Sequence, residues 1–163
     1  MGEVISLERA VSVRDEQRRA DKKVVFTNGT FDLLHRGHVE YLNKARLLGD
    51  ALFLGLNSDD SVRRLKGEGR PIMQEDDRAY LLANLLCVDY VIVFNEDTPI
   101  KLIESIIPDI LVKGADWTVD TIVGKDVVEQ HGGTVMTIEL TPGRSSTSVI
   151  ETIRERLTYF KQQ

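Results

Sequence analysis

Two of the chain's three histidines, His35 and His38, stand three residues apart with Gly37 between them. They follow an apolar, β-branched run at residues 24–27 and a glycine turn, and they open a stretch with helical spacing. Imidazoles beside a helix N-terminus are suited to hold a polyphosphate, because the helix dipole and its free amides also attract anions. We therefore interpret the pair as catalytic residues that bind phosphate, in preference to capping histidines. A metal site is disfavoured because no cysteine or third histidine stands nearby in the sequence.

The turn before the histidines has the composition of a phosphate-binding loop. A glycine lets the backbone approach a phosphate closely, and the amides that follow it can donate hydrogen bonds. Asp32 in the same loop is a candidate substrate-side residue that could contact a magnesium ion, directly or through water. The nucleotide-binding residues predicted here are Asn28, Gly29, Thr30, Phe31 and Gly37.

A second segment, residues 141–150, joins the last predicted strand to the last predicted helix. Proline and glycine near its start mark a turn, and small hydroxyl residues at a helix start can both cap the helix and bind an anion. Alone, the segment predicts an ordinary helix cap. Together with the histidine loop it predicts a second phosphate-binding element, in which Ser146 and Thr147 contact the nucleotide and Arg144 adds a positive charge suited to phosphate.

Residues 57–71 form a basic stretch with two glycines, which we interpret as a loop. It is either a solvated charged loop or a loop that closes over substrate. Lys66 is the predicted catalytic contact to an α-phosphate, and Arg70 is a predicted substrate contact. Arg78 lies a little further along the chain. It could support the site or form a structural ion pair with its neighbour Asp77.

The predicted strand at residues 110–113 leads into two small residues that leave room for a flat base. Backbone groups at such a position can recognise the edge of the base. The nucleotide contacts predicted here are Lys113, Gly114 and Ala115. Trp117 is a candidate for stacking, with packing as the alternative role.

These candidate residues need a scaffold, and the hydrophobic pattern of the sequence predicts one. Nearly continuous apolar runs alternate with helical patterns along the chain. The apolar runs lie at 24–27, 51–56, 90–94, 110–113 and 134–138, and the helical patterns lie near 39–48, 76–86, 98 onward and 146 onward. Runs of this kind are typical of parallel strands buried on both faces. We predict one α/β domain, a doubly wound parallel sheet of five strands over residues 23–163, with residues 1–22 as a helical lead-in. Such sheets bind ligands at the carboxyl ends of their strands, where the strand order reverses.

Composition narrows the class of protein. The 163 residues carry a net charge of −5, which disfavours nucleic acid or an anionic membrane as a partner. The single cysteine, Cys87, lies in an apolar setting and is predicted to be buried. No apolar run is long enough to span a bilayer and no signal peptide is evident, so we expect a cytoplasmic protein.

The run GTFDLLHRGHVEYLNKARLLGD closely resembles the signature of the cytidylyltransferase-like nucleotidyltransferases. That resemblance implies a Rossmann-like fold and transfer of a nucleoside monophosphate from a triphosphate, with the two histidines contacting the phosphates. It also implies that Ser146 and Thr147 belong to a late Ser-Thr-Thr-type helix start that grips the β- and γ-phosphates. Serine replaces the last threonine here.

Three further segments resemble the heptose-phosphate adenylyltransferase branch in order and spacing: NSDDSVRRLKGEGRP, EDTPIKLIESIIPDILVKGADW and GKDVVEQHGGTV. The branch implies transfer of AMP from ATP, with Mg²⁺, to D-glycero-β-D-manno-heptose 1-phosphate, giving ADP-heptose and pyrophosphate. Such a product serves lipopolysaccharide inner-core or surface-glycan biosynthesis. Some members are fused to a sugar kinase. No kinase segment is present in this sequence, so we expect the stand-alone form, as a homodimer by analogy with relatives.

Two alternatives stay open at this stage. A glycerol-3-phosphate cytidylyltransferase or an FAD synthase would share the histidine loop, because short motifs define the base and acceptor pockets poorly. A non-catalytic nucleotide-binding module belongs to another class of protein. It is disfavoured because both phosphate-binding segments are intact.

Overall fold

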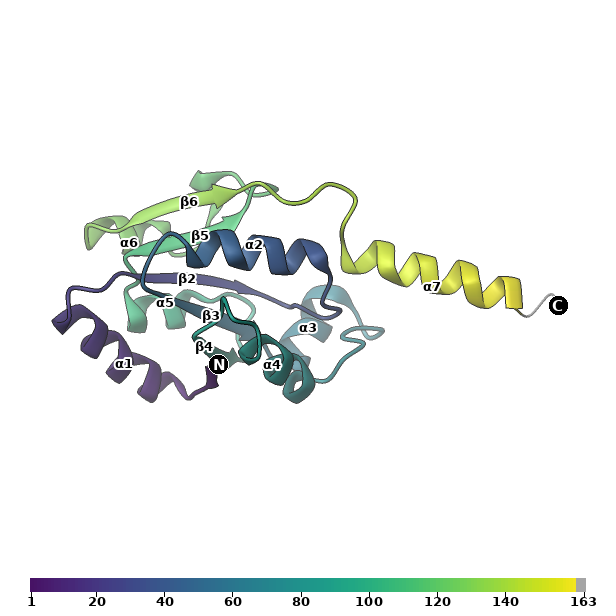
Figure 1. The fold of residues 1–163 in the computed structure, drawn as a ribbon, viewed down its shortest axis with the longest axis horizontal. Coiled ribbons are helices and arrows are strands. Elements are labelled where there is room, and N and C mark those ends of the chain that lie inside the picture. Colours follow the sequence, from purple (N-terminus) through teal and green to yellow (C-terminus); the bar gives the residue numbers. More distant parts are fainter. Residues whose placement is uncertain (161–163) are drawn as a thin grey trace.

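The computed structural model describes residues 1–160, so the domain expected over residues 23–163 extends three residues beyond the described part. Within residues 1–160 all strands lie in one parallel sheet with the order β1-β4-β3-β2-β5-β6 (Figure 1). The strands are β1 (Glu3–Val4), β2 (Val24–Gly29), β3 (Ala51–Asn57), β4 (Tyr90–Phe94), β5 (Ile110–Gly114) and β6 (Thr134–Ile138). The predicted α/β class and parallel sheet are confirmed.

The predicted count of five strands is wrong, because β1 adds a sixth strand at the edge of the sheet. Glu3 and Val4 pair with Tyr90 and Val91 of β4, and both are exposed. A strand of two exposed residues, one of them charged, produces no apolar run in the sequence. Only its backbone bonds define it, including the bond from Ile5 N to the carbonyl of Val91 at 2.9 Å.

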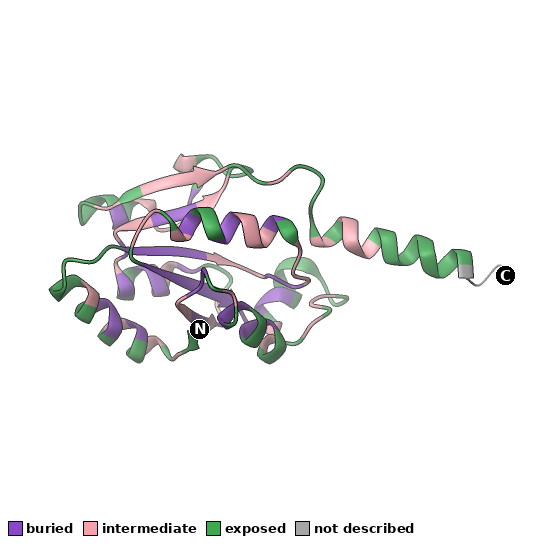
Figure 2. Ribbon diagram, in the orientation of Figure 1, coloured by how far each residue is buried: buried purple, intermediate pink, exposed green. Residues whose placement is uncertain are grey.

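Helices cover both faces of the sheet. They are α1 (Leu7–Arg19), α2 (Arg36–Arg46), α3 (Asp59–Lys66), α4 (Glu75–Ala83), α5 (Ile100–Ile106), α6 (Lys125–Gln130) and α7 (Ser146–Phe160), with a short 3-10 turn, η1 (Val119–Thr121). Helices α2 and α4 pack on one face and α1, α5 and α6 pack on the other. Helix α7 projects away from the sheet, and most of its length is exposed (Figures 1 and 2).

The interpretation of residues 57–71 as a loop is wrong for its first half, which forms α3. Ser58 caps this helix by accepting a hydrogen bond from Ser61 N at 3.1 Å. Acidic residues occupy the first turn of α3 and basic residues its last turn, as the helix dipole favours. Lys66 is therefore the last residue of a helix, and the loop proper begins at Gly67.

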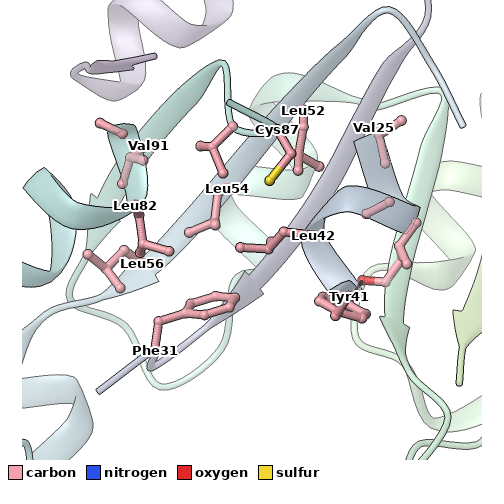
Figure 3. Packing of buried hydrophobic residues seen from close by; sticks show 14 of the residues in the cluster. Val25, Phe31, Tyr41, Leu42, Leu52, Leu54, Leu56, Leu82, Cys87 and Val91 are labelled. Atoms are coloured by element: carbon pink, nitrogen blue, oxygen red, sulfur yellow. Dashed lines mark hydrogen bonds between the residues drawn. The ribbon is translucent and has the colours of Figure 1, made fainter. Parts of the chain in front are cut away.

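The core explains why the strands are apolar throughout. Along β3, Leu52, Leu54 and Leu56 pack toward α2 and α4, whereas the alternate residues pack toward the other layer of helices. Figure 3 shows Leu42 of α2 and Leu82 of α4 lying against this row. Cys87 is buried in the same cluster, as predicted. No helix within residues 1–160 combines the length and apolar character needed to cross a bilayer.

Helix α1 is fastened to the sheet by a buried arginine. The Arg14 side chain is 4% exposed, and its Nη2 donates to Asp109 Oδ1 at 2.8 Å. Asp109 Oδ2 in turn accepts the amide of Val24 at 2.7 Å. These bonds join α1 to the starts of β2 and β5, the two neighbouring strands at which the sheet reverses its order.

Candidate active site

A cavity of about 590 Å³ opens at the carboxyl edge of the sheet, beside the ends of β2 and β5. Strands β3 and β4 lie to one side of β2, and β5 and β6 lie to the other, so this is the point at which the strand order reverses. The volume suits a small-molecule ligand. Predicted site residues on its wall are Asn28, Gly29, Thr30, Phe31, His35, Gly37, His38, Lys66, Arg70, Lys113, Gly114, Trp117, Arg144, Ser146 and Thr147.

The two histidines form a stacked pair at the N-terminus of α2. Their ring centroids lie 3.7 Å apart, with 22° between the ring planes. His35 precedes the helix and His38 lies in its first turn. Both Nδ1 atoms are buried without a hydrogen-bond partner in the part of the chain that the structure describes. Because buried polar atoms are almost always paired, these unpaired nitrogens make the two histidines candidate ligand contacts.

The environment of the pair favours neutral imidazoles. Burial, and to a smaller extent His35, lower the pKa of His38 from 6.5 to about 4. Burial, and to a smaller extent Arg144, lower the pKa of His35. Two neutral rings can stack closely, whereas two imidazolium ions would repel each other. A bound polyanion would offset both causes.

Gly37 lets three parts of the site approach one another. A Cβ atom at this position would lie 3.1 Å from His35 Nδ1 and 3.1 Å from Arg144 Cβ. Both distances are shorter than ordinary van der Waals contacts. The glycine between the histidines is therefore what allows the His35 ring and the segment before α7 to lie against α2.

The loop after β2 is held by a strained but buried residue. Phe31 has a φ of 42°, in the left-handed region that disfavours a bulky side chain. Its ring is only 5% exposed and its centroid lies 5.1 Å from that of His38. Figure 3 shows the ring at the end of the core cluster. Packing thus fixes a conformation of order 1–3 kcal/mol above an ordinary one, as is frequent at functional sites.

The start of α7 lies beside the histidine loop. Ser145 and Ser148 cap the helix reciprocally: Ser148 N donates to Ser145 Oγ at 3.0 Å, and Ser145 N donates to Ser148 Oγ at 3.2 Å. Ser146 Oγ donates to the carbonyl of Leu33 at 3.2 Å and so joins α7 to the loop. Thr147 is exposed on the cavity wall. Two helix N-termini, α2 and α7, therefore border one cavity.

Lys113 bridges the two strands at the reversal point. Its Nζ donates to the carbonyl of Asn28 at 3.2 Å and lies 5.6 Å from the centroid of the Trp117 ring. Burial lowers the pKa of Lys113 from 10.5 to about 8, and Asp116 partly opposes that shift. The Asn28 Oδ1 atom beside it is buried and unpaired within residues 1–160.

Asp32, which the sequence suggested as a magnesium or substrate contact, is completely buried behind the cavity wall. Its Oδ1 accepts the amides of Ile72 and Met73 at 2.7 and 2.9 Å, and its Oδ2 accepts Arg70 Nε. The carboxylate is thus occupied by the chain itself. It anchors the segment that carries Arg70 to the cavity.

Arg78 is also completely buried. Its Nη1 donates to the carbonyls of Thr30 and Asn57 at 2.6 and 2.9 Å, and its Nη2 pairs with Asp59 at 2.7 Å. The sequence left two roles open for Arg78, support of the site or a structural ion pair. These contacts fit the structural ion pair, but its partner is Asp59 and not Asp77. Arg78 ties the ends of β2 and β3 together.

Ala115, a predicted nucleotide contact, is exposed outside the cavity wall, and its amide donates to the carbonyl of Ile138 at 2.9 Å. The backbone at this position is therefore used to extend the pairing of β5 with β6. Gly114 and Trp117 still reach the cavity.

Several residues on the wall were not predicted from the sequence. Their common feature is that they lie at or just after the carboxyl end of a strand, which is the signal that could have identified them. They include Asn57 at the end of β3, Asp97, Thr98 and Pro99 after β4, Asp116 after β5, and Leu140 and Thr141 after β6.

Comparisons with known proteins agree with this geometry. The family described as cytidylyltransferase-like matches residues 26–156. The bifunctional protein HldE of Syntrophotalea carbinolica is 61% identical over 144 residues, covering 88% of this chain and 29% of that protein. The bifunctional protein HldE of Helicobacter pylori is 52% identical over 151 residues, covering 93% of this chain and 31% of that protein. The chain thus spans about 30% of the length of these relatives.

Two solved structures are similar. The lipopolysaccharide core biosynthesis protein from Thermoplasma volcanium is 30% identical with a TM-score of 0.60, covering 74% of this chain and 97% of that protein. Pantoate-beta-alanine ligase from Francisella tularensis, complexed with beta-gamma ATP and beta-alanine, has a TM-score of 0.59 over 90% of this chain and 69% of that protein. At 14% identity, the second shows the fold alone.

Proposed function

This chain belongs to the cytidylyltransferase-like family, and we propose that it transfers AMP from ATP to D-glycero-β-D-manno-heptose 1-phosphate, giving ADP-heptose and pyrophosphate. The observation that carries the proposal is the stacked His35–His38 pair beside two helix N-termini, whose buried Nδ1 atoms have no hydrogen-bond partner within residues 1–160. The identity to the HldE proteins and the similarity to a lipopolysaccharide core biosynthesis protein support the sugar acceptor and a role in lipopolysaccharide or surface-glycan assembly.

In the proposed reaction, a phosphate oxygen of the acceptor attacks the α-phosphorus of ATP in line. The new phosphorus–oxygen bond forms as the bond to the β-phosphate breaks, and pyrophosphate leaves with the electron pair. The acceptor phosphate is already ionised at neutral pH, so no strong general base is needed. Catalysis then consists of positioning and charge stabilisation.

The residues on the wall divide these tasks. His35 and His38 donate hydrogen bonds to the triphosphate, and Ser146 and Thr147, with the N-terminus of α7, hold the departing pyrophosphate. Lys66 at the end of α3 reaches the α-phosphate. On the other side of β2, the segment from Lys113 to Trp117 surrounds the base, with backbone groups at Gly114 and the Trp117 ring beside it.

Magnesium enters as part of the substrate, MgATP. Within residues 1–160 no three His, Cys, Asp or Glu side chains cluster closely enough to hold a metal ion. The ligands that Mg²⁺ prefers, phosphate oxygens and water, come with the nucleotide. The roles proposed for the residues of this chain are contacts to the phosphates.

The test is pyrophosphate release across a matrix of ATP and CTP with heptose 1-phosphate, glycerol 3-phosphate and FMN. We expect release with ATP and heptose 1-phosphate. Preference for CTP with glycerol 3-phosphate, or for ATP with FMN, would reassign the chain within its family. Binding of ATP without pyrophosphate release from any pair would favour the binding module.

His38→Ala tests the assigned site within the same assay, and His131→Ala is its matched control. His131 is exposed at the end of α6, where its ring contacts the carbonyl of Val127. We expect His38→Ala to lower turnover by at least about a hundredfold, in the range reported for loss of a charge-stabilising donor. Near-full turnover by His38→Ala would refute the role.

The homodimer expected from relatives is part of the same proposal. Helix α7 offers a surface for it, because Ile153 and Leu157 stand one helical turn apart and are 49% and 56% exposed. Light scattering of the purified protein tests the oligomeric state. A monomer at micromolar concentration would contradict the expectation.

A further inference from the structure

The turn between β4 and α5 forms one side of the cavity and has no part in the nucleotide contacts described above. Asp97, Thr98 and Pro99 line the wall there, beside Asn57 at the end of β3. The base side of the cavity, from Lys113 to Trp117, follows β5, on the other side of β2. An acceptor that attacks in line must approach the α-phosphorus from the side opposite the departing pyrophosphate. With the base placed beyond β2 toward β5, the β3–β4 side is the region left for the acceptor.

This turn is held in place by α3. Arg64 Nε donates to Asp97 Oδ1 at 2.7 Å, and the Nη2 atom of the same guanidinium donates to the carbonyl of Asn95. Ser61 Oγ donates to the carbonyl of Glu96 at 2.8 Å. Side chains from one helix thus fix three successive residues of the turn. The Arg64 contact places the Asp97 carboxylate at the cavity wall.

The charge of Asp97 indicates what it can bind. Most charged side chains on the wall are cations, as a phosphate-rich ligand requires, and a carboxylate among them would repel phosphate. Arg64 occupies Oδ1, yet the Asp97 side chain is still 59% exposed. An ionised carboxylate is an acceptor only, and hydroxyl groups are donors that suit it. A polyhydroxylated ligand therefore fits this position, and the Thr98 hydroxyl beside it can donate or accept.

We propose that the β4–α5 turn binds the hydroxyl groups of the sugar, with Asp97 as a specificity-determining residue. This inference rests on the proposed function and assigns the acceptor side of the same cavity. The competing assignment is the ribose of ATP. Asp116 is better placed for that role, because it lies on the base side next to Gly114 and Lys113.

Isothermal titration calorimetry with ADP and with ADP-heptose separates the sugar from the nucleotide. We expect Asp97→Asn to weaken ADP-heptose binding at least about tenfold, because the complex loses a hydrogen bond from the sugar to a charged acceptor. ADP has no sugar of this kind, so its binding should stay within twofold of wild type. Retained ADP binding also shows that the variant is folded. In the pyrophosphate assay, the same variant should raise the KM for heptose 1-phosphate at saturating ATP and leave the KM for ATP unchanged.

Asp60→Asn is the matched control. Asp60 lies on α3, is 69% exposed and pairs with Arg63, much as Asp97 pairs with Arg64, but it stands away from the cavity wall. Thr98→Val provides a second variant of the turn with its charges intact, and we expect it to weaken ADP-heptose binding without affecting ADP.

Three results would overturn the inference. If Asp97→Asn behaves like Asp60→Asn while the wild-type protein makes ADP-heptose, the proposed function stands and the sugar contact fails. If Asp97→Asn weakens ADP and ADP-heptose equally, the carboxylate serves the nucleotide. If the wild-type protein neither releases pyrophosphate nor binds ADP-heptose more tightly than ADP, both proposals fall.

Discussion

Replacing His38 with asparagine removes a group that the folded chain keeps neutral under conditions in which the unfolded chain protonates it. Burial and His35 lower the pKa of His38 from 6.5 to about 4. As the pH falls through 6.5, the unfolded chain takes up a proton that the folded chain does not bind until about pH 4. The stability associated with neutral His38 is therefore present above pH 6.5 and is lost as the pH falls toward 4.

The size of this effect follows from the two pKa values. Between pH 7.5 and pH 5 the wild-type protein should lose about 2 kcal/mol of unfolding free energy through His38, and the full difference of about 3 kcal/mol is reached below pH 4. The His38→Asn variant lacks this loss. From pH 7.5 to pH 5, the unfolding free energy of the variant minus that of wild type should thus rise by about 2 kcal/mol. This change does not depend on how far the two stabilities differ at pH 7.5.

Urea unfolding of the ligand-free proteins at pH 7.5, 6 and 5 measures that difference, with Trp117 fluorescence and circular dichroism as two probes. His35 shifts in the same direction and is retained in both proteins, so comparison with the variant isolates His38. Parallel stability profiles for the two proteins would refute the reasoning. So would a His38 imidazole signal that titrates near pH 6.5 in the NMR spectrum of the free protein.

Three substitutions test other parts of the site. Gly37→Ala should leave the melting temperature nearly unchanged, because the better helix propensity of alanine offsets a tight contact of its Cβ atom. The same substitution should weaken ATP binding at least about tenfold, because the Cβ atom displaces the His35 ring. An unchanged affinity for ATP in calorimetry would contradict this. Lys113→Met should raise the unfolding free energy at pH 7 by about 3 kcal/mol, since lowering the pKa of the buried amine from 10.5 to about 8 makes its protonated form costly in the folded chain, while ATP binding weakens; a loss of stability in urea would count against it. Asp32→Asn should cost about 3 kcal/mol in urea unfolding and lower kcat/KM, because the buried carboxylate that accepts the amides of Ile72 and Met73 and pairs with the partly exposed Arg70 is lost; wild-type values of both would show that the anchor is unimportant.

The parts of the site that could be predicted from the sequence are those in which function and local structure use the same few residues. The histidine loop is defined within residues 24–38, because a buried strand, a glycine turn and a helix start follow one another directly. The start of α7 is similar. Local patterns of this kind need no knowledge of distant contacts.

The roles of Asp32 and Arg78 could not be predicted in the same way. Both are charged residues near a phosphate-binding loop, and in the sequence they resemble ligand contacts. In the structure their partners lie far along the chain: Arg78 binds the carbonyl of Thr30, 48 residues away, and Asp32 accepts the amide of Met73, 41 residues away. Only the fold shows that backbone groups and one ion-pair partner each already satisfy these charges.

Strand β1 and helix α3 were missed for a different reason. The signal for a strand is burial, and β1 is an exposed edge held by backbone bonds. Helix α3 is short and rich in charged residues, which suggested a loop, although its Ser58 cap, acidic first turn and basic last turn are local helix signals; its last residue, Lys66, reaches the cavity. The placement of Asp97 depends on α3 through Arg64, so the acceptor side of the site was the part least visible in the sequence.

The electrostatics of the free site favour an anionic ligand on both sides of the strand reversal. His38 follows β2 and Lys113 ends β5, and burial lowers the pKa of each. Both residues thus hold a base in an environment that resists its protonation. This destabilises the free protein only where the unfolded chain is protonated, below about pH 6.5 for His38 and below about pH 10.5 for Lys113. A polyphosphate supplies the missing negative charge, so its binding should raise both pKa values, draw protons from solution and stabilise the fold. The groups that resist protonation in the free chain are therefore expected to contribute affinity for a polyphosphate, and selectivity for charged phosphate over neutral ligands.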